Sequence, residues 1–348
     1  MRQLEPGGAW FRLKQRALAR AQPLGAYLEL TYRCNWRCVF CYNPRHSDRR
    51  GLSAGEWTSV LDDLRALGTL AVTLTGGEPL AHPGFLDVAR AAAARRFALR
   101  IFTNGTLVSE AVADAIADLP PLAVEMSLHG ATADTHDRLT GAPGSFDAMR
   151  RGLERLRARR VPLLVKSLLT SVNESELDGM IALAERLGVP HQVDATVTPR
   201  DDGDRGPLGY RASPEAIALM YRRTAERGRL PAAAHEEGGV NCGLGRTTLA
   251  VDPEGDVYPC IQWRRTSLGN VRATPLRELW RGSAVREEAA AVARAANETM
   301  RGAGGGLATF PFCPALAQQH TGDPLVPDAG HAEQARIVAD LRAAPASG

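Results

Sequence analysis

The chain of 348 residues lacks any apolar run of the ~18 residues that a membrane-spanning helix needs. Its segment 1–25 carries scattered charges and has no continuous apolar stretch like that of a secretory signal peptide. We therefore expect no membrane contact and a cytoplasmic protein. Because that compartment is reducing, the six cysteines are better explained as metal ligands than as disulfides.

Aromatic residues and net charge are also scarce. Phe, Trp and Tyr make up 5% of the chain, and 42 basic against 39 acidic residues leave a net charge of +3. Nucleic-acid surfaces need clustered positive charge and aromatic side chains that stack on bases. The arginine pairs at 49–50, 159–160 and 264–265 are expected to be solvated, and we expect no nucleic-acid partner.

Half of the cysteines lie in the stretch 31–44, TYRCNWRCVFCYNP, where Cys34, Cys38 and Cys41 form a C-x3-C-x2-C array. Thiolates are the soft ligands of iron-sulfur clusters, and three on one loop can hold three corners of a [4Fe-4S] cube. The fourth iron can then bind a small molecule. A zinc knuckle fits less well, because structural zinc usually takes four ligands from paired C-x2-C units. Three unrelated thiols are the other alternative.

The array resembles that of the radical SAM enzymes, in which the open iron of the cluster is chelated by S-adenosylmethionine. Further motifs of that family follow in their expected order. Residues 76–79, Gly-Gly-Glu-Pro, resemble the GGEP motif that receives the methionine amino group, and residues 103–106 and 127–130 resemble segments that close later strands. The resemblance covers residues 25 to about 199.

The same resemblance implies which residues contact S-adenosylmethionine. The backbone of the aromatic residue before the third cysteine touches the adenine, and a serine at the end of a later strand binds the ribose. The expected cofactor-binding residues are Phe40, Tyr42, Gly76, Gly77, Glu78, Pro79, Asn104, Ser127 and Lys166.

Some of these positions have two explanations. Gly76 and Gly77 let backbone approach a ligand and Glu78 can accept from an ammonium, or the three form a strand-ending turn with a solvent-facing glutamate. Asn104 either caps the following turn or reaches the cofactor. Lys166 lies in an apolar stretch that predicts burial, so its ammonium needs either the methionine carboxylate or a carboxylate of the barrel.

His129 and Asp194 fall at or near predicted strand ends and are candidate acid-base groups. Single residues of this kind are more often structural, which is the alternative at both positions.

From residue 26 the sequence alternates strand-like and helix-like stretches, which predicts a parallel sheet covered by helices. Ser53 and Glu56 form a capping-box pattern at one helix start. The expected strands are 26–32, 71–75, 98–103, 123–128, 162–169 and 191–197, and the expected helices are 53–67, 84–95, 110–118, 145–159 and 175–187. Six repeats match the partial (β/α)6 TIM barrel of the family, an α/β fold. The candidate residues then lie at the carboxyl ends of the strands.

A Gly- and Pro-rich linker, 199–214, and a helix from Ser213 to about 228 precede the next informative segment. Cys242 and Cys260 frame two strand-like runs around the turn 252–255, which predicts a hairpin. Because a hairpin brings its ends together, the two cysteines should be neighbours.

This segment resembles the SPASM domain, or its shortened form, the twitch domain. Cys242, Gly255 and Cys260 have its C-x12-G-x4-C spacing, but only Cys313 follows, whereas a complete SPASM domain carries more cysteines and two auxiliary clusters. The resemblance implies one auxiliary [4Fe-4S] cluster bound by Cys242, Cys260 and Cys313. Its fourth iron would be open or bound by a residue within sequence reach, namely Asp323, Asp328, His320 or His331. Three buried reduced thiols are the alternative.

These observations divide the chain into an N-terminal helical extension and a radical SAM core, followed by three further segments. In the N-terminal extension, an apolar face with Trp10 and Phe11 is expected to pack on the barrel. In the SPASM/twitch-like domain, residues 276–294 are expected to form one amphipathic surface helix. The expected segments are 1–24, 25–199, a linker and helix over 200–237, a SPASM/twitch-like α+β domain over 238–330, and a C-terminal helix and tail over 331–348.

The resemblance implies an enzyme in which a 5′-deoxyadenosyl radical abstracts hydrogen from a substrate. Modification of a ribosomally made peptide, by a crosslink, oxidation or epimerisation, is the leading interpretation. The expected partners are a reductant such as flavodoxin or ferredoxin and, since little sequence precedes residue 26, a small leader-peptide-binding protein. The alternatives are a small-molecule substrate (sugar, amino acid or tetrapyrrole) and an iron-sulfur electron-transfer protein. An electron-transfer protein, however, needs no ligand-binding motif such as GGEP.

Overall fold

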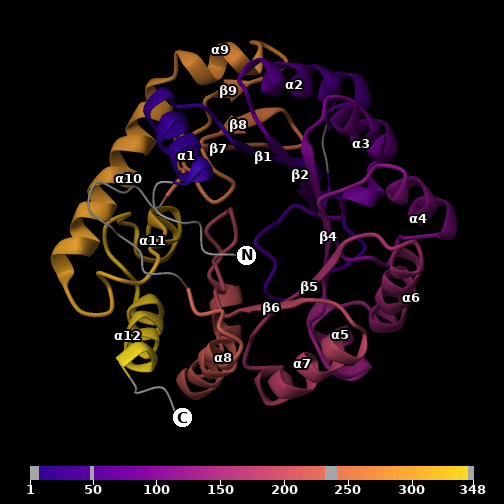
Figure 1. The fold of residues 1–348 in the computed structure, drawn as a ribbon, viewed down its shortest axis with the longest axis vertical. Helices are drawn as coiled ribbons and strands as arrows, with labels where there is room; N and C mark the ends of the chain where they lie inside the picture. The colour runs from indigo at the N-terminus through magenta and orange to yellow at the C-terminus, as the bar shows by residue number, and fades with distance from the viewer. Residues whose placement is uncertain (1–7, 48–50, 232–241, 344–348) are drawn as a thin grey trace.

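The computed structural model describes residues 8–47, 51–231 and 242–343. Its strands form one nine-stranded sheet in the order β6-β5-β4-β3-β2-β1-β7-β8-β9. The sheet curves around an interior, and helices cover its outer face (Figure 1). The strands are β1 Gly25–Thr31, β2 Ala71–Gly76, β3 Ala98–Thr103, β4 Ala123–Ser127, β5 Leu163–Leu168, β6 His191–Asp194, β7 Thr248–Val251, β8 Asp256–Tyr258 and β9 Gly269–Asn270.

Strands β1 to β6 are all parallel to their neighbours, which confirms the expected partial (β/α)6 barrel and the α/β class. The helices are α1 Ala9–Arg20, α2 Ala54–Ala66, α3 Phe85–Ala94, α4 Glu110–Ala117, α5 Ala133–Thr140, α6 Ser145–Ala158, α7 Leu177–Arg186, α8 Pro214–Glu226, α9 Leu276–Arg281, α10 Ala284–Ala303, α11 Pro314–Thr321 and α12 Ala329–Ala343. Short 3-10 turns lie at Pro79–Ala81, Glu174–Glu176 and Gly206–Tyr210.

Alternation along the strands separates an apolar outer face from a polar interior. Leu28 of β1, Leu74 of β2 and Ile101 of β3 belong to one hydrophobic core with the covering helices. Because successive side chains of a strand point to opposite faces, Glu29 and Arg100 lie on the other face, inside the barrel. The barrel interior therefore carries charge.

Local capping signals set several helix boundaries. Ser53 and Glu56 form the predicted capping box at the start of α2, and Ser213 caps α8 as expected. Helix α5 was not predicted. The expected single helix over 276–294 is wrong, since Ser283 caps a new helix and separates α9 from α10, and Trp280 of α9 is buried.

The predicted hairpin is confirmed by the antiparallel pair β7 and β8. Strand β7 also pairs in parallel with β1, with Gly25 opposite Thr248 and Leu28 opposite Val251. The hairpin thus extends the barrel sheet beyond β1, an arrangement that the sequence did not predict.

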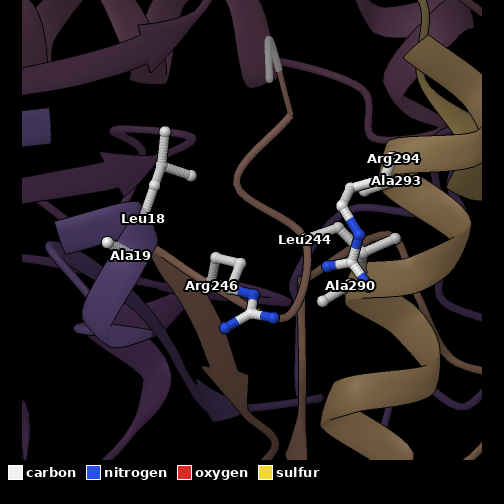
Figure 2. Close-up of a pocket in the computed structure, with 7 residues that line it drawn as sticks. All are labelled: Leu18, Ala19, Leu244, Arg246, Ala290, Ala293 and Arg294. Carbon is white, nitrogen blue, oxygen red and sulfur yellow. The ribbon is translucent and has the colours of Figure 1, made fainter. Parts of the chain in front are cut away.

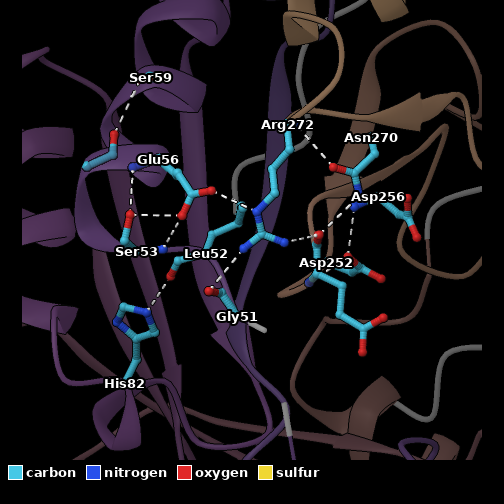
Figure 3. A network of polar contacts seen from close by, with 12 residues as sticks. Gly51, Leu52, Ser53, Glu56, Ser59, His82, Asp252, Asp256, Asn270 and Arg272 are labelled. Carbon is cyan, nitrogen blue, oxygen red and sulfur yellow. Dashed lines mark hydrogen bonds and ion pairs between the residues drawn. The ribbon is translucent and has the colours of Figure 1, made fainter. Parts of the chain in front are cut away.

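The turn of this hairpin is docked on the start of α2 through Arg272 (Figure 3). Its guanidinium donates to Glu56 Oε1 at 2.7 Å, to Glu254 O at 3.0 Å and to Gly51 O at 3.1 Å. One side chain therefore holds the helix start, the hairpin turn and the preceding segment together.

The N-terminal helix makes fewer apolar contacts than expected. Trp10 and Phe11 are 43% and 39% exposed, so they do not form the packed face predicted for them, whereas Ala17 is fully buried. Figure 2 shows Leu18 of α1 across a cavity of about 230 Å³ from Ala290 of α10. No helix in the described ranges combines the length and apolar character needed to cross a membrane.

Candidate functional site

The loop that carries Cys34, Cys38 and Cys41, the first thiol triad, follows β1 at its carboxyl end. The backbone of Arg37 donates to Thr140 O at 2.8 Å and that of Val39 donates to Leu139 O at 3.0 Å, so the end of α5 supports the loop. Within the loop, Cys41 N donates to Cys38 O at 3.0 Å. These bonds hold the loop in a fixed turn.

The thiols of this triad are close enough to influence one another. Burial raises the pKa of Cys34 to about 11 and that of Cys38 well above its usual value, and the charge of Cys41 raises both further. Three buried thiolates repel one another and need positive charge beside them. The iron ions of an iron-sulfur cluster supply that charge and bind the thiols in their deprotonated form. The residues therefore fit a cluster.

In the described part of the chain, no three His, Cys, Asp or Glu side chains converge on a single metal ion. The thiolates of a [4Fe-4S] cube bind different irons, so they need not converge in that way. The donor set of the first thiol triad is consistent with a cube.

Gly76 and Gly77 approach protein backbone closely, and their expected role in admitting a ligand stays a prediction. A Cβ at Gly77 would lie 2.5 Å from Arg33 O and 2.7 Å from Tyr32 O, and a Cβ at Gly76 would collide with Thr31 O. Gly77 N donates to Thr31 O at 2.7 Å. The end of β2 is thus pressed against the segment that leads into the cysteine loop.

The Glu78 side chain is fully buried, so the alternative of a solvent-facing glutamate is wrong. Its Oε1 accepts from Thr103 Oγ1 at 2.7 Å and from Leu80 N at 3.0 Å, while Oε2 accepts from Asn104 N at 2.7 Å. Burial raises the pKa of Glu78 to about 7 against these bonds. Glu78 therefore joins the carboxyl ends of β2 and β3, beside the cysteine loop, and Pro79 begins the next turn.

Asn104 caps its turn and also reaches the cysteine loop. Its Oδ1 accepts from Thr106 N at 2.9 Å, and its Nδ2 donates to Asn35 Oδ1 at 2.8 Å and lies 4.0 Å from Cys34 Sγ. The amide is therefore next to the first thiol triad.

His129 packs on the aromatic side chains of the same loop. Its ring lies 4.8 Å from that of Phe40 and 6.4 Å from that of Trp36. Burial lowers the pKa of His129 to about 3, so the imidazole is neutral. Asp194 is exposed at the end of β6, where its Oδ1 accepts from Thr196 N. The acid-base roles of both residues stay predictions.

Lys166 is not buried as its apolar neighbours predicted, because its side chain is 35% exposed in the barrel interior. Its ammonium pairs with Glu125, which also pairs with Arg100, and it lies 4.0 Å from the Phe102 ring centroid. A barrel carboxylate, one of its two expected partners, is thus present. Ser127 is the register partner of Lys166.

A buried ion pair connects the two cysteine-bearing parts of the chain. Tyr42, which follows Cys41, donates its hydroxyl to Glu29 Oε1 at 2.9 Å, and Arg264 Nη2 pairs with Glu29 Oε2. The Arg264 side chain is 10% exposed, so the expectation of a solvated arginine at this position is wrong. Glu29 was missed, although a glutamate within an apolar strand is a signal that could have been noticed.

Cys242, Cys260 and Cys313, the second thiol triad, pack together around Leu244 and Trp263. Burial raises the pKa of Cys242 to about 12, and the charges of the other two thiols add to that rise.

The second thiol triad also receives hydrogen bonds from its own loops. Burial raises the pKa of Cys313 to about 11, and the N–H groups of Ala315 and Leu316, at the start of α11, oppose that rise. Burial also raises the pKa of Cys260, and the backbone N–H groups of Gln262 and Trp263 oppose that rise. Such hydrogen bonds to sulfur tune iron-sulfur clusters, so these residues fit a cluster.

The side chains considered as a fourth ligand have other partners. His320 and Asp328 pair with each other, and Arg211 Nη2 contacts Asp328 at 3.2 Å. His331 packs its ring on Phe310 at 5.1 Å. Asp323 Oδ1 accepts from Leu325 N.

Comparisons with known proteins agree with both sites. The radical SAM superfamily model matches residues 28–184, and the SPASM model, an iron-sulfur cluster-binding domain, matches residues 242–302. The solved structure of Streptococcus suis SuiB bound to its precursor peptide SuiA has a TM-score of 0.63 at 14% identity, covering 82% of this chain and 72% of that chain. That likeness supports the fold.

Three curated relatives are similar in sequence. The mycofactocin maturase MftC of Mycobacterium ulcerans is 30% identical over 68% of each chain, and the PqqA peptide cyclase of Ruegeria pomeroyi is 29% identical over 74% of each. The AdoMet-dependent heme synthase of Methanosarcina barkeri is 27% identical over 77% of this chain and 85% of that protein. The chain therefore belongs to the radical SAM superfamily and carries a SPASM iron-sulfur cluster-binding domain, whose match includes Cys242 and Cys260 and ends before Cys313.

Proposed function

We propose that this enzyme modifies a ribosomally made peptide. The observation that carries the proposal is its similarity, across about three quarters of each chain, to a PqqA peptide cyclase. The fold also matches that of a protein solved with a precursor peptide.

The chain's residues have distinct tasks in this proposal. Cys34, Cys38 and Cys41 would hold a [4Fe-4S] cluster with S-adenosylmethionine, which together supply a 5′-deoxyadenosyl radical for hydrogen abstraction. Asn104 bonds to the cysteine loop, and Glu78 joins the ends of β2 and β3 beside that loop. Ser127 and Lys166 remain proposed contacts of the cofactor. The cysteines of the second thiol triad would hold an auxiliary cluster.

The barrel interior suits a peptide. Arg100 and Lys166 keep 37% and 35% of their side chains exposed there and share the buried carboxylate of Glu125. A peptide backbone has polar groups that need hydrogen-bond partners when water is displaced. Charged side chains that line the interior can provide such partners.

The experiment that tests the proposal uses the reconstituted protein under anaerobic conditions, with S-adenosylmethionine, a reductant and a synthetic copy of a short peptide encoded beside its gene. The expected result is 5′-deoxyadenosine together with a peptide mass or stereochemistry changed at one site. The variant with Cys34, Cys38 and Cys41 replaced by Ala should give neither. Cofactor cleavage without any peptide change, with or without a small leader-binding protein, would contradict peptide maturation.

Modification of a tetrapyrrole is the second candidate function. It is favoured by the similarity to a heme synthase of which this chain covers 85%, a larger share than for the peptide cyclase. The same assay with an iron porphyrin that carries propionate groups tests it. A flavodoxin or ferredoxin is the proposed electron donor in either case.

A further inference from the structure

The interior face of the barrel sheet is only partly covered by other side chains. Along β3, Leu99 and Ile101 are buried against the covering helices, whereas Arg100 and Phe102, which alternate with them, are half-buried. Lys166 of β5 has a similar exposure on the same face. Because successive side chains of a strand point to opposite faces, the accessible surface of these residues belongs to the interior. A ligand inside the barrel can therefore touch them.

This part of the interior carries more positive than negative charge. One carboxylate oxygen of Glu125 accepts from Arg100 Nη2, and the other pairs with the ammonium of Lys166. Glu125 is buried, and within the described ranges no other carboxylate pairs with either cation. Both cations also lie over the Phe102 ring, with Arg100 Cζ at 5.6 Å and Lys166 Nζ at 4.0 Å from its centroid. One carboxylate is thus shared by two cations, and one positive charge is left for a ligand.

Tyr27 of β1 adds a second donor at the same level of the barrel. Tyr27 and Arg100 are both register partners of Thr73 of β2, and the Tyr27 ring packs edge-on against Phe102 at a centroid distance of 6.4 Å. Among the residues that the structure describes, neither the Tyr27 hydroxyl nor Nε and Nη1 of Arg100 has a hydrogen-bond partner, and none of these atoms is fully buried. Accessible donors therefore surround the free charge.

The position of these donors relates them to both thiol triads. Burial raises the pKa of Tyr27, the charge of Cys260 raises it further, and the charge of Arg100 lowers it, so Tyr27 lies within electrostatic reach of both residues. Asn104, four residues after Arg100, lies beside Cys34 of the first thiol triad. A molecule held at Arg100 is thus placed inside the barrel between the two triads.

We propose that a carboxylate of the substrate binds in the barrel interior, where Arg100 supplies the positive charge and Tyr27 donates its hydroxyl. Charge-assisted hydrogen bonds suit a carboxylate, and the Phe102 ring offers apolar contact to the carbon atoms next to it. The carboxylate belongs either to a peptide, as a side chain or terminus, or to a tetrapyrrole, as a propionate. This inference deepens the proposed function, on which it rests, by naming a chemical group of the substrate.

The test measures probe binding to the reconstituted protein by anaerobic isothermal titration calorimetry. The clusters are oxidised and S-adenosylmethionine is saturating, so that an acid cannot bind in the cofactor's own site. Each acid is compared with a neutral partner: N-acetylglutamic acid α-amide with N-acetylglutamine α-amide, N-acetylalanine with N-acetylalaninamide, and an iron porphyrin dipropionate with its dimethyl ester. At least one acid should bind roughly tenfold or more tightly than its partner. The pair with the largest difference identifies the source of the carboxylate.

Two variants locate the binding. Arg100→Gln removes the charge but leaves Glu125 paired with Lys166, and should remove most of the preference for the acid. Tyr27→Phe keeps every charge and should weaken acid binding roughly two- to tenfold, which covers the case that Arg100→Gln does not fold. Arg151→Gln, an exposed change of equal charge on α6, is the control and should have no effect.

Equal binding of every acid and its neutral partner to the unaltered protein would overturn the proposal. Because these titrations involve no turnover, that result would leave peptide modification standing. An unchanged preference for the acid in folded Arg100→Gln would also overturn the proposal. If Arg100→Gln does not fold, unchanged acid binding in Tyr27→Phe would do so.

Discussion

Tyr42 donates a 2.9 Å hydrogen bond to the buried carboxylate of Glu29. The other oxygen of that carboxylate pairs with Arg264. Tyr42 follows Cys41, and Arg264 lies in the loop after Cys260, so one glutamate of β1 ties together the loops of both thiol triads. The relative position of the two sites is thereby set within the protein.

Replacing Glu29 by Gln should lower the free energy of unfolding by about 3 to 5 kcal/mol, because it leaves the Arg264 charge buried without its partner. Tyr42→Phe removes one hydrogen bond and should cost only about 1 kcal/mol. Anaerobic thermal unfolding compares the two variants. The double variant Glu29→Gln with Arg264→Gln should recover part of the lost stability. Equal stability of Glu29→Gln and Tyr42→Phe would argue against energetic coupling of Glu29 with Arg264.

Gly77→Ala should displace the cysteine loop, since the added Cβ would meet the carbonyls of Arg33 and Tyr32. Overpacking of this kind costs about 1 to 3 kcal/mol, and the variant should retain less iron after reconstitution. Gly25→Ala is the matched control, because a Cβ there has no atom within 4 Å. If the two variants retain the same iron, the close approach of β2 to the loop has no consequence for the site.

Glu78→Gln should destabilise the protein and weaken S-adenosylmethionine binding. Both carboxylate oxygens accept hydrogen bonds, and an amide nitrogen would face either Asn104 N or the pair of Thr103 and Leu80 donors. A buried donor without its acceptor costs about 1 to 3 kcal/mol. Because Glu78 joins the strand ends beside the cysteine loop, the affinity for S-adenosylmethionine should fall roughly ten- to a hundredfold. Calorimetric titration measures this, with the exposed Glu154→Gln as control; unchanged affinity would separate Glu78 from the cofactor site.

Acid should destabilise the fold through His136, which is fully buried and accepts from His129 N. Burial lowers the pKa of His136 to about 4, whereas the unfolded chain has an ordinary value near 6.5. The unfolded state therefore binds the proton first, and stability present above about pH 6.5 is lost as the pH falls toward 4, by about 1.4 kcal/mol per unit. Unfolding of His136→Leu measured from pH 7 to 5 should show a shallower slope, and an unchanged slope would exclude His136 as the source.

Much of the barrel could be predicted from the sequence, because its signals are local. The strand over 98–103 and the capping box of Ser53 depend on alternation and on residues three apart, and both agree with the structure. The first thiol triad was predicted from cysteine spacing, and the second was implied by the resemblance to the SPASM domain. The structure brings the members of each triad together, as their mutual influence on pKa shows.

The remaining features depend on contacts between distant segments. Arg264 looks like a solvated arginine until Glu29, a residue of the first strand, is seen beside it. The close approach of Gly77 to the carbonyl of Arg33 could not be predicted either. Lys166 follows apolar residues, yet the strand turns it into an open, charged interior. The environment of such residues is set by tertiary packing, and a local sequence pattern does not predict it.

The central claim is that the chain holds two iron-sulfur clusters, and iron counting with matched triple variants tests it most directly. The reconstituted protein should contain about eight irons. Replacement of Cys34, Cys38 and Cys41 by Ala should leave about four and abolish 5′-deoxyadenosine formation. Replacement of Cys242, Cys260 and Cys313 should also leave about four, with cofactor cleavage retained. Full iron content in either triple variant would contradict the assignment of that triad as a cluster site.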